Sequence, residues 1–163
     1  MTDKRSEVYR EVTPEALTEA RGIVSLARHG ALAAVGTSGH PVASRVAVAS
    51  LEGGRVPLLF VSGLAAHTPQ LRADPRCSLL VGELGKGDPM ANPRVTLVCR
   101  AREILRDGAE HEELRAVWLA AHPKAKVYVD LADFVFMRLG VEAVSFVGGF
   151  GRAYTISGEE WLG

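Results

Sequence analysis

Apolar residues near the start of the chain recur with the period of a helix. The positions that share this period are Leu17, Ala20, Val24 and Ala27. They fall three or four residues apart, as on one face of an α-helix. Thr13 suits the N-cap, and Pro14 suits the first helical position, where no backbone donor is needed. The pattern predicts a helix from Pro14 to about residues 29–30, where Gly30 can adopt a positive φ and end it.

From Ala31 onward the apolar residues come in short runs that turn residues separate. Glycine, proline and small polar residues mark turns at residues 37–41 and 52–54 and a longer loop at residues 83–93. The runs predicted as strands cover residues 31–35, 41–51, 57–62, 77–81 and 94–105. The stretch from Phe134 to Phe146 is broken at Gly140, which predicts a sixth strand, a turn and a seventh strand.

Helices interrupt this series of strands in two places. They are expected over residues 64–73 and 109–121, and each stops before a proline, because the residue that precedes proline disfavours helix. Ser157 and Glu160 form a capping-box pattern for a terminal helical turn. Strands joined by tight turns favour an antiparallel barrel, since parallel strands need a long crossover between them. The predicted fold class is α+β, mainly β, with six or seven antiparallel strands and flanking helices.

Length and charge narrow the class of protein. The 163 residues fit a single domain over 1–163, in which residues 1–12 are expected to be poorly ordered. Lys plus Arg and Asp plus Glu both total 19, and this balance argues against binding to nucleic acid or to a membrane surface. No apolar run approaches the ~20 residues of a membrane span. No signal-peptide pattern is visible, so a cytoplasmic location is expected. Cys77 and Cys99 lie outside any CxxC spacing, which excludes a disulfide scaffold and a thiolate zinc site, and no metal site is predicted.

The segment from Phe60 to Thr68 is the first candidate for anion binding. A buried strand leads into small residues and a predicted helix start, where unpaired backbone N–H groups favour an anion. Ser62, His67 and Thr68 add side-chain donors at the same place. The alternative interpretation is an ordinary helix start that Ser62 or Thr68 caps.

A second candidate is the pair Ser44 and Arg45 in the strand predicted over residues 41–51. Successive strand residues point to opposite faces, so only one of the two side chains can face a given site. An arginine inside a barrel needs an anion or a carboxylate, because an unpaired buried guanidinium is costly. The alternative is that Arg45 lies on a solvated face.

Three further patterns favour structural roles. Gly149-Phe150-Gly151 lacks the third glycine of a dinucleotide-binding fingerprint. Asp130 and Asp133 lie three residues apart without a base–nucleophile pattern, so helix capping is the preferred interpretation. His111 falls near a predicted helix start, where a structural role is preferred over metal binding.

The order of several short motifs resembles the flavin-binding split-barrel superfamily, whose namesake is pyridoxamine 5′-phosphate oxidase. In chain order these motifs are Gly39-His40-Pro41, Ser44-Arg45, Phe60-Val61-Ser62, His67-Thr68 and Asp74-Pro75. Later segments are most similar to the haem-utilisation-like branch of that superfamily, namely His122-Pro123, Tyr128–Phe134 and Gly148–Ala153. The resemblance covers residues 14–156 and implies a split β-barrel.

The resemblance implies FMN bound at the interface of a homodimer. The positions that match flavin-binding residues are Ser44, Arg45, Ala47, Val61, Ser62, Ala66, His67, Thr68 and Arg94. By this match, the first three border the flavin and the next two lie near its phosphate and ring. The following three form the phosphate-binding helix start, and the last reaches the flavin from the partner strand. The superfamily often carries Arg or Lys where this chain has His67 and Thr68, so hydroxyls, backbone N–H groups and Arg45 are expected to bind the phosphate.

The function that the resemblance implies is an FMN-dependent oxidoreductase acting on a small molecule. The last residues, Glu159–Gly163, lack the arginine-rich segment of the namesake oxidase, which argues against pyridoxamine phosphate as substrate. Haem-degrading members use a histidine near the C-terminus, whereas the last histidine here is His122. The alternatives are a non-catalytic flavin- or haem-binding module, the deazaflavin F420 in place of FMN, and a structural β-barrel domain.

Overall fold

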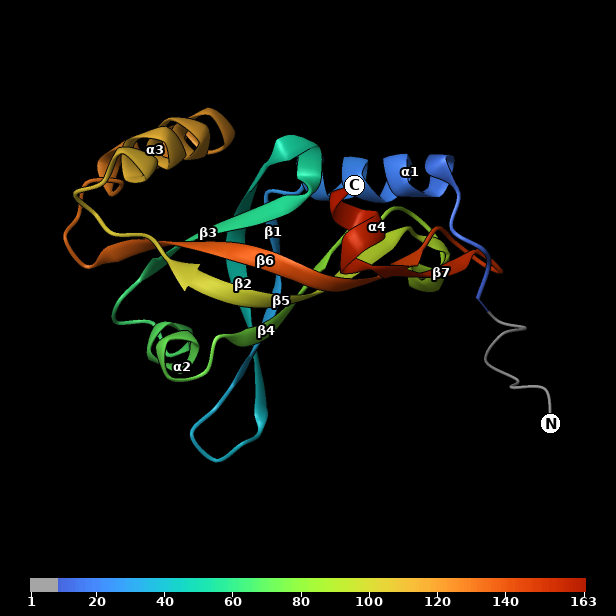
Figure 1. The fold of residues 1–163 in the computed structure, drawn as a ribbon, viewed down its shortest axis with the longest axis horizontal. Coiled ribbons are helices and arrows are strands. Elements are labelled where there is room, and N and C mark those ends of the chain that lie inside the picture. The colour runs from blue at the N-terminus through green and yellow to red at the C-terminus, as the bar shows by residue number, and fades with distance from the viewer. Residues whose placement is uncertain (1–8) are drawn as a thin grey trace.

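The computed structural model describes residues 9–163 and contains a seven-stranded antiparallel sheet. The strands follow the order β3-β2-β1-β4-β5-β6-β7, and β3 also pairs with β6. Six strands therefore close into a barrel, and β7 extends the sheet beyond it (Figure 1). The α+β class and the antiparallel barrel predicted from the sequence are confirmed.

The element boundaries follow the predicted runs closely. The strands are β1 (His29–Val35), β2 (Pro41–Leu51), β3 (Val56–Ser62), β4 (Arg76–Val81), β5 (Arg94–Glu103), β6 (Phe134–Val147) and β7 (Ala153–Ser157). The helices are α1 (Pro14–Leu26), α2 (His67–Ala73), α3 (Ala109–Ala121) and α4 (Gly158–Leu162). Short 3-10 helices are η1 (Glu52–Gly54), η2 (Pro89–Ala91) and η3 (Pro123–Val127).

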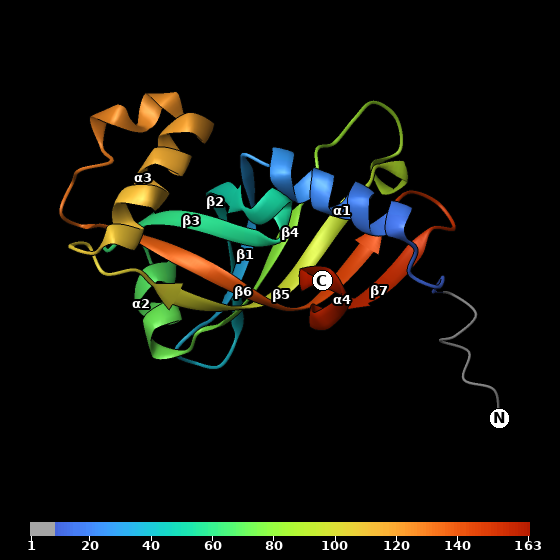
Figure 2. The same cartoon turned by 45° about the horizontal axis from the view of Figure 1, so that its top comes forward.

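Alternation along the strands builds the main core inside the barrel. Leu32 of β1 and Val46 and Val48 of β2 are buried there, while their neighbours Ala31 and Arg45 are exposed. Helix α1 lies across the barrel (Figure 2) and adds its small apolar face to the same core. The residues of that face are Ala16, Ala20 and Val24. The N-cap prediction holds, because the Thr13 side chain accepts a hydrogen bond from the Ala16 amide (3.1 Å).

A second core lies under α3, on the outer side of β3 and β6. Trp118 of α3 is fully buried and packs with Phe60 and Phe136, at ring-centroid distances of 5.7 Å and 6.2 Å. Strand β3 is therefore covered on both faces, with Leu59 and Val61 in the main core and Phe60 in the second. This double burial explains why the segment reads as an unbroken apolar run.

The first helix ends earlier than predicted, at Leu26, and His29 and Gly30 belong to β1. Gly30 ends no helix. A Cβ placed on it would lie 2.7 Å from the Leu80 carbonyl oxygen, so a glycine is needed for the close approach of β4. The helix instead finishes at Ala27 in an extended conformation.

The stretch predicted as two strands around Gly140 is one strand, β6. Gly140 pairs with Arg100 of β5, and the irregularity of the ladder is a bulge at Val98 and Cys99. The bulge absorbs an extra residue without breaking the strand. The seventh strand is β7, which follows the turn around Phe150. The helix expected to begin at residue 64 begins at His67.

The expectation of poor order over residues 1–12 falls largely on residues 1–8, which lie outside the described residues. After them, Tyr9 forms a parallel bridge with Ala153, and the Arg10 amide donates to the Ala153 carbonyl (2.8 Å). Among residues 9–163, no helix is long and apolar enough to span a membrane.

Trp161 joins the C-terminal helix to the barrel, and its truncation should destabilise the fold strongly. The side chain is fully buried, and its Nε1 donates to the Arg55 carbonyl (2.8 Å). We expect Trp161→Ala to lower the free energy of unfolding by about 3–5 kcal/mol in urea denaturation. Leu162 is 49% exposed, so Leu162→Ala should cost less than about 1 kcal/mol. Equal effects of the two variants would contradict the assigned role of Trp161.

Candidate functional site

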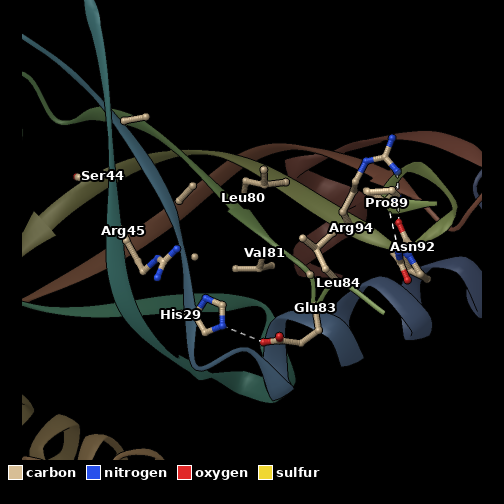
Figure 3. A pocket seen from close by; sticks show the side chains of 15 residues that line it. His29, Ser44, Arg45, Leu80, Val81, Glu83, Leu84, Pro89, Asn92 and Arg94 are labelled. Carbon is tan, nitrogen blue, oxygen red and sulfur yellow. Dashed lines mark hydrogen bonds and ion pairs between the residues drawn. The ribbon is translucent and has the colours of Figure 1, made fainter. Parts of the chain in front are cut away.

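A pocket of about 470 Å³ opens on the outer side of β1, β2 and β4. The loop of residues 82–93 closes its other side (Figure 3). Arg45 and His29 lie toward one end of the pocket, and Arg94 with Asn92 lies toward the other. Its volume is in the range of small-molecule and cofactor sites.

The strand register explains why the pocket forms there. Ala31 of β1 pairs with Arg45 of β2 on one side and with Leu80 of β4 on the other, so the three side chains share the outer face. Ala31 and Ala43 are too short to fill that face. The pocket floor is therefore shallow and apolar, with a guanidinium at its edge.

The charged groups of the pocket differ in how far they are already paired. Arg45 makes no ion pair or side-chain hydrogen bond with any residue in 9–163. Arg94 donates from Nη1 to the carbonyls of Met90 (2.9 Å) and Asn92 (3.3 Å), and these bonds hold the loop against β5. The Nε2 atom of His29 lies 3.1 Å from a Glu83 carboxylate oxygen, and both residues are exposed. The whole Arg45 guanidinium is thus available to an anionic ligand.

The structure divides the residues predicted from the resemblance into three groups. Ser44, Arg45 and Arg94 line the pocket. Ala47 packs against the second core beneath α3, and Val61 is buried in the main core. The remaining four lie at the turn between β3 and α2, and they are Ser62, Ala66, His67 and Thr68.

One contact links that turn to the pocket. The Ser44 hydroxyl lies 3.2 Å from Nδ1 of His67. Burial lowers the pKa of the His67 imidazole below its usual value, which favours the neutral ring at neutral pH. His67 is therefore a hydrogen-bonding partner there and supplies little positive charge.

The turn between β3 and α2 is closed by an acidic residue. The Ser62 hydroxyl donates to Oδ2 of Asp133 (2.9 Å) and accepts from the Leu64 amide (3.1 Å). The Gly63 amide donates to the Asp133 carbonyl. Thr68 is fully buried, and its hydroxyl donates to the Ser62 carbonyl. Neither Ser62 nor Thr68 caps α2, whose N-cap, Ala66, has no side-chain bond.

Contrary to the expectation from the sequence, neither Asp130 nor Asp133 caps a helix. Asp130 pairs with Arg115 (2.7 Å), and Asp133 bonds Ser62. The Arg106 guanidinium donates to the carbonyls of residues 130, 131 and 134 and so fixes the loop between them. His111 is buried in the second core against Phe136, which agrees with a structural role.

The two cysteines are opposite each other in the β4–β5 ladder, although 22 residues separate them in the sequence. Both are buried free thiols. Burial raises the pKa of Cys77 to about 11, and it also raises the pKa of Cys99. A thiolate nucleophile at neutral pH is therefore disfavoured. Within residues 9–163, no three His, Cys, Asp or Glu side chains gather to hold a metal ion.

Sequence reasoning missed His29, Glu83 and Asp133. His29 was assigned to the end of a helix, which hid its place at an outward position of β1. Burial alternates along β1, but the small residues from Gly30 to Ala34 give no clear alternation in the sequence. Nothing in the local sequence around Asp133 indicates that it meets Ser62, 71 residues away.

The lowered pKa of His67 predicts that acid destabilises the fold. The unfolded state, with a pKa near 6.5, binds a proton before the folded state does, so stability falls as pH drops through 6.5. We expect His67→Gln to flatten this slope in urea denaturation between about pH 7.5 and 5. His40 is exposed on the β1–β2 turn, so His40→Gln should keep the wild-type dependence of stability on pH. An unchanged slope in His67→Gln would refute the assignment.

Comparisons with known proteins identify relatives of this chain. The non-canonical haem oxygenase HOZ, a chloroplastic protein of Arabidopsis thaliana, is 37% identical over 121 residues, which are 74% of this chain and 36% of HOZ. A haem-binding protein from Mycobacterium smegmatis has 39% identity and a TM-score of 0.83, over 93% of this chain and 61% of that one.

More distant structures share the fold. A protein related to general stress protein 26, of the pyridoxinephosphate oxidase family, from Clostridium acetobutylicum has 13% identity. Its TM-score is 0.71, over 92% of this chain and 99% of that one. The predicted resemblance to the split-barrel superfamily is confirmed, since these structures share its fold. Residues 13–163 match the family described as "CREG, beta-barrel", and the chain belongs to that family.

Proposed function

We propose that this protein binds haem in the pocket between β1, β2 and the loop of residues 82–93. The observation that carries the proposal is the pocket wall itself. It combines the imidazole of His29 with the unpaired guanidinium of Arg45 and an apolar floor that includes Leu80. Haem needs these three chemistries, because it presents an iron, carboxylates and a flat apolar ring.

The residues present fit that group. A volume of about 470 Å³, open on one side, leaves room for a flat ligand that is only partly enclosed. Two relatives, at 37% and 39% identity, are named as a haem oxygenase and a haem-binding protein. This chain spans 36% of the first relative and 61% of the second.

Three residues would hold the group. His29 would supply a ring nitrogen to the iron, with Glu83 accepting a hydrogen bond from the other ring nitrogen and fixing the tautomer. Arg45 would pair with a carboxylate. Bound haem would supply iron-centred chemistry with oxygen, while the protein binds, orients and partly shields it.

A second candidate function is an FMN-dependent oxidoreductase. It is favoured by Arg45, which can pair with a phosphate as well as with a carboxylate, and by the contact of Ser44 with His67. An absorption spectrum separates the two proposals. A Soret band appears with haem, and bands in the blue and near-ultraviolet that a nicotinamide donor bleaches appear with a catalytic flavin.

The haem proposal predicts different effects at His29 and Arg45. In hemin titrations, His29→Ala should abolish the shift of the Soret band that follows iron ligation, whereas His40→Ala, outside the pocket, should retain it. Arg45→Ala should weaken binding about tenfold to a hundredfold, the usual value of one charge-assisted hydrogen bond. Arg72 pairs with Glu103 outside the pocket, so Arg72→Ala should keep wild-type affinity. A normal Soret shift in His29→Ala would exclude His29 as the iron ligand.

We also propose the homodimer that the resemblance implies, formed through the outer face of β1, β4 and β5. Leu80 and Val98 are each 43% exposed on this face, and neighbouring alanines allow a second sheet to approach closely. The pocket opens on the same face, so a second copy would cover it. The cytoplasmic location expected from the sequence stays a prediction.

Light scattering at micromolar concentration should give the mass of two chains of 17.4 kDa. We expect an interface of about 2,000 Å² or more, since apolar obligate interfaces have that size. Val98→Glu should shift the protein toward monomer, because it places a charge on the apolar face. Leu64 is 89% exposed outside this face, and Leu64→Glu should stay dimeric. A wild-type monomer would contradict the proposal.

A further inference from the structure

Three donors at the turn between β3 and α2, the Ser62 hydroxyl and the amides of Gly63 and Leu64, already have partners within the protein. The Ser62 hydroxyl and the Gly63 amide both donate to Asp133, one to its carboxylate and the other to its carbonyl. The Leu64 amide donates to the Ser62 hydroxyl oxygen. A free anion would have to displace these bonds.

From this arrangement we infer that Asp133 is a specificity-determining residue that excludes phosphate-bearing ligands from the site. Its carboxylate takes the place at the Ser62 hydroxyl that a phosphate oxygen would need. It also places a negative charge there, and a phosphate would meet that charge without a compensating cation. The inference deepens the proposed function and rests on it in one respect, since it explains why the pocket would accept haem over FMN.

The neighbouring charges support this assignment. The Arg106 guanidinium bonds the carbonyls of residues 130, 131 and 134, so the loop that carries Asp133 is held in position. Arg115 pairs with Asp130 and is not aimed at Asp133. Burial favours the neutral form of His67, the titratable group of α2 at this turn. Within residues 9–163, Asp133 has no ion-pair partner.

The turn adjoins the pocket through β2, the strand that carries both Ser44 and Arg45. Ser44 lines the pocket, and its hydroxyl lies 3.2 Å from His67 at the start of α2. A ligand seated on the pocket floor with a phosphate on a flexible arm would extend past Ser44 toward Ser62. Riboflavin has the same ring and arm without the phosphate, so it provides a matched ligand for comparison.

The test compares FMN with riboflavin in three proteins by quenching of flavin fluorescence. In the wild-type protein the two affinities should be nearly equal, because the Asp133 carboxylate occupies the Ser62 hydroxyl and repels the phosphate. In Asp133→Asn the charge is removed while the side-chain shape is kept, and the ratio of FMN to riboflavin affinity should rise about tenfold. Asp130→Asn removes a carboxylate three residues away in the same loop and should leave the ratio at its wild-type value.

Two results would overturn the inference. One is a wild-type protein that already prefers FMN over riboflavin by about tenfold, which means that the turn is open to phosphate. The other is an Asp133→Asn protein in which the ratio of FMN to riboflavin affinity is unchanged. This result includes the case in which both flavins bind more tightly because the loop has become less ordered.

A second measurement decides the question if no flavin binds. Inorganic phosphate is titrated into the wild-type protein and Asp133→Asn while the amide signals of Gly63 and Leu64 are followed by NMR. Saturable shifts in the variant alone support the inference, and their absence in the variant overturns it. Hemin affinity is measured in parallel. A wild-type protein that fails to bind hemin contradicts the proposed function and leaves the phosphate result standing.

Discussion

Closure of the barrel by the pairing of β3 with β6 is the constraint on which the other features depend. This ladder runs from Leu58–Arg138 to Ser62–Phe134, and it joins two strands that are distant in the sheet order. Once the ring is closed, alternate residues of each strand are assigned to the inside or the outside. Ala31, Arg45 and Leu80 are therefore fixed on the outer face, where the pocket forms.

Closure also brings the functional segments together. The end of β3 meets the start of β6 through the pairing of Ser62 with Phe134, and this pairing places Asp133 beside the Ser62 hydroxyl. The same strand supports α3 on its other face through Phe60. One strand thus separates the main core from the second core and carries the turn that bears on cofactor choice.

Most of the architecture could be predicted from the sequence, because short apolar runs between turn residues directly report strands. The predicted boundaries were wrong where a glycine has two possible structural roles that look the same in the sequence. Gly30 looked like a helix end, but its role is to let β4 approach. Gly140 looked like a turn, but β6 continues through it because β5 pairs with it. Local sequence cannot distinguish these cases, since the deciding atoms belong to other strands.

The candidate site could be predicted only in part for the same reason. Ser44, Arg45 and Arg94 were found, because each lies on a strand whose position the resemblance supplies. The roles of Arg94 and Ser62 depend on loop carbonyls and on Asp133, which are brought near by tertiary structure. Residue type alone indicates what a side chain can bind, and the fold decides whether that capacity is already used.

The contacts between α1 and α4 have a consequence for the order of folding. Arg21 donates from its guanidinium to the carbonyl of Trp161, across 140 residues of sequence. A contact of such separation gains its free energy only after a very large loop has closed, so it forms late. During synthesis, α1 leaves the ribosome long before its partner exists. Helix α1 must therefore remain without its contacts to α4 until residues 158–162 have been made.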